Sequence, residues 1–313
     1  AGELLAGPRR AEINAATMLN QSKTMHQAEI DSACELIDFW RFNAMYARDI
    51  YEDQQPPVSP SSMWNQVEVR PLEGFVFAVT PFNFTSIAAN LPSAPALMGN
   101  TCVWKPSRNS YVSNYRILRV MMDAGLPPGV INFLPGPASV VGDTCLASPD
   151  LAGIHFTGST GVFRQLWREV GERIASYRSY PRIVGETGGK DFILAHPDCN
   201  QDALVVALLR GAFEFQGQKC SAASRAYVPA SVWSAIKDSY VAEVNRIVVG
   251  DVSKAGVYMG AVIDQKAFTS ITGAIQRAAD DDGCEIVTGG TWDDSTGWFI
   301  QPTTIVCSDP MYE

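Results

Sequence analysis

The chain has 313 residues, of which 46% are hydrophobic and 18% charged, an ordinary composition for a globular protein of two domains. Its net charge is −9 and it has no dense Lys/Arg cluster, which argues against nucleic acid as a partner. Seven Cys without a Cys-x-x-Cys pair, and three His without metal-ligand spacing, argue against a disulfide framework or a metal site and favour a reducing compartment.

Residues 11–51 have apolar side chains at helical spacing, and a Pro- and Ser-rich connection follows at residues 54–62. Val67 and Val69 alternate with charged residues, which predicts a half-exposed strand. Residues 74–104 carry no formal charge and are long enough to span a bilayer, but their prolines and asparagines argue against a span. This stretch predicts a buried strand, a helix and a second strand instead.

Short apolar strands alternate with helices through the first part of the chain. The alternation is typical of a doubly wound, Rossmann-like parallel sheet, in which ligands bind beyond the carboxyl ends of the strands. We expect strands at Phe75–Val79, Thr101–Lys105, Val130–Leu134, Gly153–Thr157 and from Arg182, with helices at Ser86–Met98, Tyr111–Ala124, Ser139–Ala147 and Gly161–Tyr177.

The α/β pattern restarts after Gly188-Gly189, with strands expected at Phe192–Ala195, Ala226–Val228, Glu285–Val287 and Thr303–Val306 and helices at Asp202–Phe215 and Ser231–Val248. We therefore predict a first domain over residues 1–185, with a connecting or oligomerisation strand near residues 56–72, and a second, C-terminally truncated α/β domain over residues 186–313. The chain begins without Met and stops just after a strand-like run, so we expect a fragment that lacks both ends.

Cys220 lies in the polar segment Gln216-Gly217-Gln218-Lys219-Cys220-Ser221. A neighbouring lysine favours the thiolate, which is the nucleophilic form of cysteine. Considered alone, an exposed cysteine is more often incidental than catalytic.

Glu186 follows a predicted strand in Gly185-Glu186-Thr187-Gly188-Gly189-Lys190, where it is either an accessible base or a solvated loop acid. The segment is not a phosphate-binding P-loop, because its spacing is short and Asp191 follows the lysine. Asn83 follows the strand at Phe75–Val79 and is either a helix cap or an amide donor that could stabilise an oxyanion.

The segment from Thr157 to Gly161 joins a strand to a helix whose first N–H groups could hold a phosphate, although Gly-x-Gly-x-x-Gly is absent. Lys105 ends another strand and is either a cofactor contact or an ordinary surface lysine. Together, the strand-end motifs are harder to obtain by chance than any single one.

These motifs, in this order, resemble the aldehyde dehydrogenase superfamily. The matching segments are Pro81-Phe82-Asn83-Phe84, Trp104-Lys105-Pro106-Ser107, Phe156-Thr157-Gly158-Ser159, Glu186-Thr187-Gly188-Gly189-Lys190 and Gly217-Gln218-Lys219-Cys220. Longer runs, such as Glu35-Leu36-Ile37-Asp38-Phe39-Trp40 and Phe213-Glu214-Phe215-Gln216, are most similar to its Δ1-pyrroline-5-carboxylate dehydrogenase branch. That resemblance implies NAD-dependent oxidation of glutamate γ-semialdehyde to glutamate in proline catabolism.

The resemblance also implies a role for each matched residue. Cys220 would attack the aldehyde, Asn83 would steady the oxyanion with the Cys220 N–H, and Glu186 would activate water to hydrolyse the thioester. The implied NAD contacts are Thr80, Lys105, Ser107, Gly158, Ser159, Thr160, Gly161 and Val162, and the implied substrate contacts are Phe84, Ser221 and Glu35. Arg108 stands near the place where many relatives carry an acid that disfavours a 2′-phosphate, so NADP stays an alternative cofactor.

The resemblance further implies a homo-oligomeric full-length parent, without a membrane span or bound metal, in the mitochondrial matrix or otherwise in the cytoplasm. The family continues past Glu313 with further site residues, so we expect the isolated fragment to be inactive. Alternatives are another semialdehyde dehydrogenase, the dehydrogenase half of a bifunctional protein, or a non-catalytic descendant of the fold. A glutamyl-phosphate reductase is less consistent with Glu186, because its chemistry needs no water-activating acid.

Overall fold

The computed structural model describes residues 1–53 and 56–312. The chain forms two compact units. The first consists of Ala1–Asn20 and Ala28–Thr187, and the second of Gln21–Gln27 together with the residues from Gly188 onward. A short N-terminal segment therefore belongs to the second unit, which nothing in the sequence pattern indicated.

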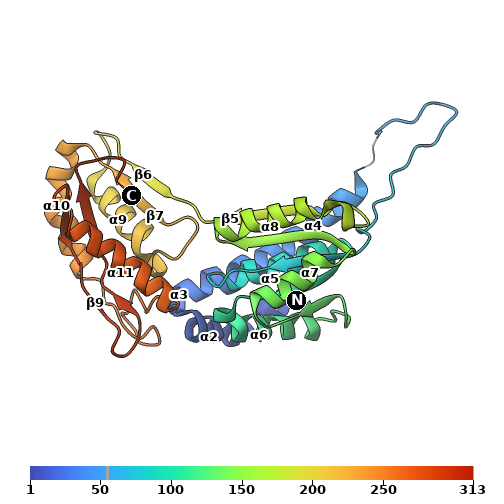
Figure 1. Cartoon of the computed structure of the whole chain (residues 1–313), viewed down its shortest axis with the longest axis horizontal. Coiled ribbons are helices and arrows are strands. Elements are labelled where there is room, and N and C mark those ends of the chain that lie inside the picture. Colours follow the sequence, from blue (N-terminus) through green and yellow to red (C-terminus); the bar gives the residue numbers. More distant parts are fainter. Residues whose placement is uncertain (54–55, 313) are drawn as a thin grey trace. The chain divides into compact units, whose positions relative to one another are not determined.

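A five-stranded parallel sheet in the order β3-β2-β1-β4-β5 organises the first unit (Figure 1). Its strands are β1 (Phe75–Val79), β2 (Thr101–Lys105), β3 (Ile131–Phe133), β4 (Leu151–Gly158) and β5 (Arg182–Thr187). The central strand β1 pairs in parallel with both β2 and β4, so the chain crosses the sheet between β3 and β4. This order confirms the predicted doubly wound sheet.

Apolar clusters cover both faces of this sheet. Val76 and Trp104 belong to one cluster, whereas Phe77 and Ile154 belong to the other, as expected for side chains that alternate along a strand. The covering helices are α4 (Glu35–Glu52), α5 (Thr85–Leu97), α6 (Tyr111–Asp123), α7 (Ala138–Ala147) and α8 (Thr160–Glu172). The uncharged stretch thus forms β1, α5 and β2 within the core, and no helix of the described residues is long and apolar enough to cross a membrane.

The N-terminal region with helical spacing folds as several helices rather than one. It consists of α1 (Gly2–Ala6), α2 (Arg10–Gln21), α3 (Met25–Ala28), the π-helix η1 (Glu29–Cys34) and α4. Ser22 has a φ of 61°, a left-handed conformation that ends α2. At the start of η1, the Glu29 carboxylate accepts hydrogen bonds from the Arg10 guanidinium and the Asn14 amide, which anchors the π-helix to α2.

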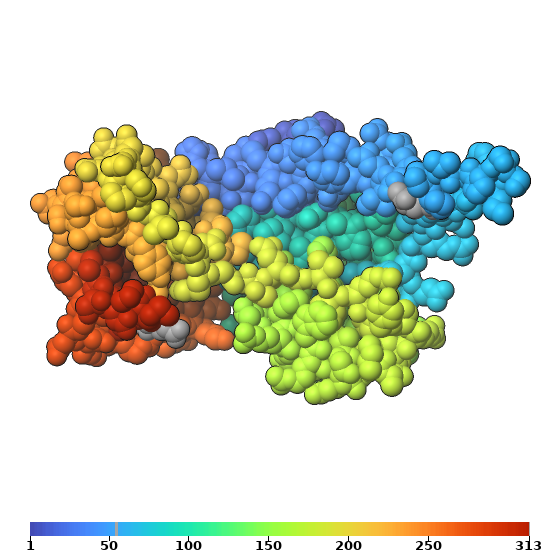
Figure 2. All heavy atoms as spheres, turned by 90° about the horizontal axis from the view of Figure 1, so that it is seen from above, coloured from blue at the N-terminus to red at the C-terminus, as the bar shows by residue number. Residues whose placement is uncertain are grey.

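The strand predicted near residues 56–72 has no pairing partner within the described chain. Residues 56–72 include no strand and extend from the first unit as a narrow, mostly exposed segment (Figures 1 and 2). Val67 and Val69 are half-buried and alternate with exposed charges, as their pattern suggested. Alternation alone does not make a strand, because a strand is defined by hydrogen bonds to a neighbouring one, and no sheet among the described residues includes this segment.

Three small sheets and three long helices form the second unit. β6 (Asp191–Leu194) pairs in parallel with β7 (Ala223–Tyr227), β8 (Cys284–Thr288) pairs antiparallel with β11 (Thr304–Cys307), and β9 (Trp292–Asp293) pairs with β10 (Phe299–Ile300). The helices are α9 (Gln201–Phe213), α10 (Ala230–Asn245) and α11 (Gln265–Ala279). Helix α11 was not predicted, although the Asp264 carboxylate caps it and Phe268 and Ile275 form its buried face.

The buried face of β4 should contribute far more to stability than the exposed face of β5. Ile154 is 1% exposed, so Ile154→Ala should lower the free energy of unfolding by about 2–5 kcal/mol. Val184 is 61% exposed, and Val184→Ala should cost less than about 1 kcal/mol. Denaturant titration of both variants measures the difference, and equal losses would contradict this assignment of the core.

Candidate active site

The carboxyl ends of four neighbouring strands bring most of the candidate residues of the first unit to one edge of the sheet. In the register of the sheet Lys105 lies opposite Val79, and Glu186 lies opposite Thr157. Gly158 ends β4 beside the end of β5. Lys105, Gly158 and Glu186 therefore lie along the edge where ligands bind in doubly wound sheets.

Thr80 and Lys105 are held at this edge by adjacent strands. The Thr80 N–H donates to the Lys105 carbonyl at 3.2 Å, and the buried Trp104 indole donates to the Thr80 hydroxyl at 2.9 Å. Burial lowers the pKa of the Lys105 ammonium, and the nearby Arg108 charge lowers it further. Ser107 lies just after the end of β2, and its hydroxyl accepts a hydrogen bond from the Asn109 N–H at 3.4 Å.

The turn after β1 places Asn83 and Phe84 at the start of α5. The N-cap residue of α5 is Phe84, without a side-chain cap, so the cap interpretation of Asn83 is wrong. Phe84 is buried, and the Ser86 hydroxyl in the first turn of α5 donates to the Glu35 carboxylate on α4. Glu35, Asn83 and Phe84 thus lie around one turn at the end of the central strand.

The first turn of α8 is open to a ligand. The Ser159 hydroxyl caps the helix by accepting from the Val162 N–H, while Thr160, Gly161 and Val162 are exposed. A Cβ atom added to Gly161 would meet no heavy atom within 4 Å. Outward N–H groups at an accessible helix start can hold a phosphate, so this turn, with Lys105 two strands away on the same edge, fits a dinucleotide.

Glu186 follows a position where only glycine fits. A Cβ atom at Gly185 would lie 2.2 Å from the Phe163 ring on α8, so the backbone of β5 packs directly against that ring. Glu186 itself is exposed. The close packing fixes the strand, while the carboxylate one residue later stays accessible to water or a ligand.

In the second unit, a left-handed turn precedes Cys220. Phe215, Gln216 and Gly217 have φ values of 52°, 57° and 69°. Such a conformation is costly for residues other than glycine and persists only where the surroundings fix it. The Gln216 amide does so here by donating to the carbonyls of Ser22 at 3.1 Å and Ala261 at 2.9 Å.

Two further side chains support the same turn. The Gln218 side-chain carbonyl accepts from the Ile263 N–H at 2.9 Å. The Lys23 ammonium lies 4.0 Å from the centre of the Phe215 ring, and both residues are fully buried. A buried cation over an aromatic face is attracted by the ring quadrupole, which is stronger without competing water. Lys23 and Gln216 were both missed in the sequence, because nothing local connects Lys23 to a turn far along the chain.

Cys220 is half-buried, and Ser221 beside it is exposed. Lys219, expected to favour the thiolate, forms an ion pair with Glu214 at 3.3 Å, so the sequence argument from its charge is weakened. Gly189 packs against the Cys220 backbone, since a Cβ atom there would lie 2.7 Å from the Cys220 carbonyl oxygen.

Two of the other cysteines are unsuited to nucleophilic attack. Burial raises the pKa of Cys102 to about 12 and that of Cys145 to about 11, so both remain protonated thiols at neutral pH. Cys220, in a polar loop, is more accessible than either.

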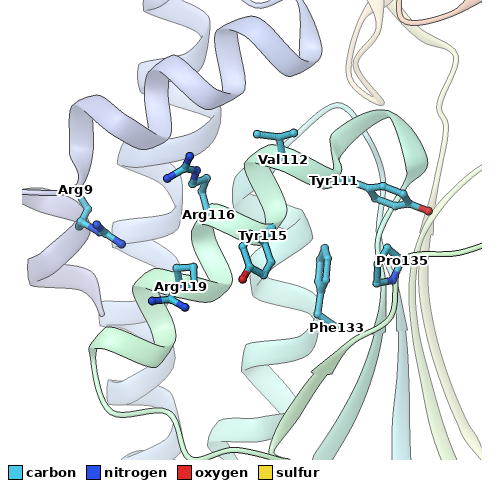
Figure 3. A pocket seen from close by; sticks show the side chains of 8 residues that line it. All are labelled: Arg9, Tyr111, Val112, Tyr115, Arg116, Arg119, Phe133 and Pro135. Carbon is cyan, nitrogen blue, oxygen red and sulfur yellow. The ribbon is translucent and has the colours of Figure 1, made fainter.

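A groove along α6 and the end of β3 carries several basic and aromatic side chains (Figure 3). Its lining residues are Arg9, Tyr111, Val112, Tyr115, Arg116, Arg119, Phe133 and Pro135. Two of the arginines are already neutralised, because Arg9 pairs with Asp123 at 2.8 Å and Arg116 pairs with Glu12 at 2.8 Å. None of the candidate residues lines this groove, although its Phe133 pairs with Trp104, the residue before Lys105.

The fold and the strand-end residues define a class of protein. The chain belongs to the aldehyde dehydrogenase family, whose profile matches residues 1–312. It is 47% identical over 315 residues to the mitochondrial Δ1-pyrroline-5-carboxylate dehydrogenase of Dictyostelium discoideum, covering 100% of this chain and 56% of that protein. The human mitochondrial enzyme of the same name is 47% identical over 312 residues, with 99% and 55% covered.

Solved structures show the same similarity. The Δ-pyrroline-5-carboxylate dehydrogenase of Mycobacterium tuberculosis superposes with a TM-score of 0.97 at 54% identity, covering 99% of this chain and 58% of that one. That relative has also been crystallised with NAD. The chain thus spans somewhat more than half the length of these relatives.

The Gln216 amide should stabilise the turn before Cys220. Gln216→Leu leaves the Ser22 and Ala261 carbonyls without this donor, which should lower the free energy of unfolding by about 1–3 kcal/mol. The matched control is Gln265→Leu at the exposed start of α11, which should change it by less than about 0.5 kcal/mol. Denaturant titration compares the two, and a Gln216→Leu protein as stable as the control would rule out this role.

Proposed function

We propose that the full-length protein oxidises glutamate γ-semialdehyde to glutamate with NAD, as a Δ1-pyrroline-5-carboxylate dehydrogenase of proline catabolism. The observation that carries the proposal is the carboxyl edge of the first sheet, where Lys105 ends β2, the open start of α8 follows β4, and Glu186 lies near the end of β5. The names of relatives at 47–54% identity support the choice of substrate.

We assign NAD binding and the nucleophile to different regions of the chain. Residues 1–185 would bind NAD, and residues 186–313 would carry the nucleophile. When bound, NAD supplies the acceptor for the hydride lost by the substrate. Thr80, Lys105, Ser107 and the segment Gly158, Ser159, Thr160, Gly161 and Val162 would hold it. The exposed Arg108 near Lys105 leaves room for NADP as the competing cofactor.

In this mechanism the Cys220 thiolate attacks the aldehyde carbon and forms a thiohemiacetal. The Asn83 amide and the Cys220 N–H donate to the oxygen as it gains negative charge. After oxidation to a thioester, Glu186 takes a proton from the water that attacks the acyl carbon. Glutamate then leaves and the Cys220 thiolate is regenerated.

Phe84, Ser221 and Glu35 would contact the substrate. The position of Glu35 supports this assignment, because its contact with Ser86 keeps it beside the turn that carries Asn83 and Phe84. Another semialdehyde would fit the same arrangement of nucleophile and base. A panel of semialdehydes differing in chain length and carboxylate separates these substrates by kcat/KM.

We further propose that the full-length protein is a homo-oligomer located in the mitochondrial matrix. The segment of residues 56–72 supports assembly, because it exposes Met63 and Trp64 by 65% and 87%. The mitochondrial names of several relatives support the location.

Replacement of the nucleophile should abolish activity in the full-length protein. Cys220→Ala removes the attacking sulfur, so NADH formation from glutamate γ-semialdehyde should fall to background. Cys199→Ala, which removes another half-buried thiol, should keep near-normal kcat. NADH absorbance gives both rates, and steady turnover by the Cys220→Ala protein would refute the mechanism.

Loss of the base should separate the two half-reactions. Glu186→Gln should lower the steady rate by about 10²–10⁴-fold, because water is no longer activated, but leave a burst of NADH near one per site. Glu172→Gln on the exposed end of α8 is the matched control and should behave as the parent. Stopped-flow absorbance resolves the burst, and its disappearance in a folded Glu186→Gln protein would give Glu186 an earlier role.

A further inference from the structure

A pair of cysteines faces across the β8–β11 ladder, away from the residues assigned to catalysis. Cys284 and Cys307 are partners in the antiparallel register, and the Cys284 thiol donates to the Cys307 sulfur at 3.4 Å. A disulfide needs the sulfurs about 2.0 Å apart, so they must move closer by little more than 1 Å. Side-chain rotation alone can supply a movement of that size.

The register favours such a bond. The Ser308 N–H donates to the Gly283 carbonyl on the next rung, so hydrogen-bonded pairing falls there and Cys284–Cys307 occupies a non-hydrogen-bonded position. At such positions the Cα atoms lie about 4.5 Å apart and the side chains are closest, which is within the range of disulfides.

The surroundings leave both thiols partly accessible to a small oxidant. Both thiols are half-buried, in contrast to the fully buried Cys102. Burial and the neighbouring Cys284 raise the pKa of Cys307 to about 11, so Cys307 stays protonated at neutral pH. Beyond Cys307, the Arg225 guanidinium donates to the carbonyls of Pro310 and Tyr312 and holds the following segment in place.

We propose that Cys284 and Cys307 form a reversible disulfide when the protein meets a peroxide. The Cys284 sulfur attacks one peroxide oxygen, the O–O bond breaks, and a sulfenic acid and one water form. The Cys307 sulfur then attacks the sulfenic sulfur, and the leaving hydroxide takes the Cys307 proton to form a second water. Two thiols and one hydrogen peroxide thus give one disulfide and two waters, and a dithiol reverses the change.

The pair is well placed for peptide mapping. Between Arg277 and Glu313 there is no Lys or Arg, and Glu285 is the first cleavage site beyond Cys284 for a glutamate-specific protease. Trypsin and that protease together place Cys284 in Ala278–Glu285 and Cys307 in the peptide starting at Ile286. A disulfide therefore joins two peptides that are separate in the reduced protein.

The test uses the full-length protein carrying Cys220→Ser, because the proposed nucleophile also reacts with peroxide. Hydrogen peroxide followed by an alkylating reagent should yield the joined peptides, lighter by two hydrogen atoms than their sum, and dithiothreitol should release them. Adding Cys284→Ser or Cys307→Ser should abolish the joined species, whereas adding Cys199→Ser should leave it unchanged. The closed loop should also raise the thermal midpoint by about 2–5 °C.

Full alkylation of both thiols after peroxide treatment, or separate sulfinic acids on each, would overturn the proposal. The readout is a mass and a melting temperature rather than turnover. Its outcome is therefore independent of whether the dehydrogenase assignment holds.

Discussion

The parallel pairing of β1 with both of its neighbours is the constraint on which the first unit depends. It places β2 on one side of β1 and β4 on the other, so the residues that follow these strands lie at the same edge. Two apolar clusters make the pairing stable, because each face of the sheet is buried. The residues proposed to bind the cofactor and to act as base, Lys105 and Glu186, are then positioned by the backbone itself, and a shift of one residue in register would change their spacing.

In the second unit, the proposed nucleophile Cys220 lies on a short loop that needs support from other residues. The loop begins with a strained turn, with Phe215 and Gln216 in left-handed conformations that only strong contacts can maintain. The contacts come from Lys23, Gln216 and Gln218, whose side chains bind backbone or ring atoms distant in sequence. Rigid support of this kind reduces the freedom that a nucleophile would otherwise lose on reaching its target.

Sequence patterns predicted what depends on local periodicity. The strands and helices of the first sheet, and Glu186 and Lys105 at strand ends, follow from apolar runs separated by turns. Features that depend on distant partners were not predictable. The alternation around Val67 indicated a strand, but this segment pairs with no other strand of the described chain. The sequence around Lys23 gave no sign of its contact with Phe215. Helix α11 was missed although its cap and apolar spacing were visible.

The segment Gln21–Gln27 has a consequence for how the protein can be divided. The chain passes between the two units after Asn20, after Gln27 and after Thr187, so neither unit is a continuous stretch of sequence. A piece beginning at Gly188 would lack the Ser22 carbonyl and the Lys23 side chain, and its turn before Cys220 would lose part of its support. Separate expression of the halves therefore requires grafting this heptapeptide onto the second one, and limited proteolysis at Gly188-Gly189 alone should not release two independently stable pieces.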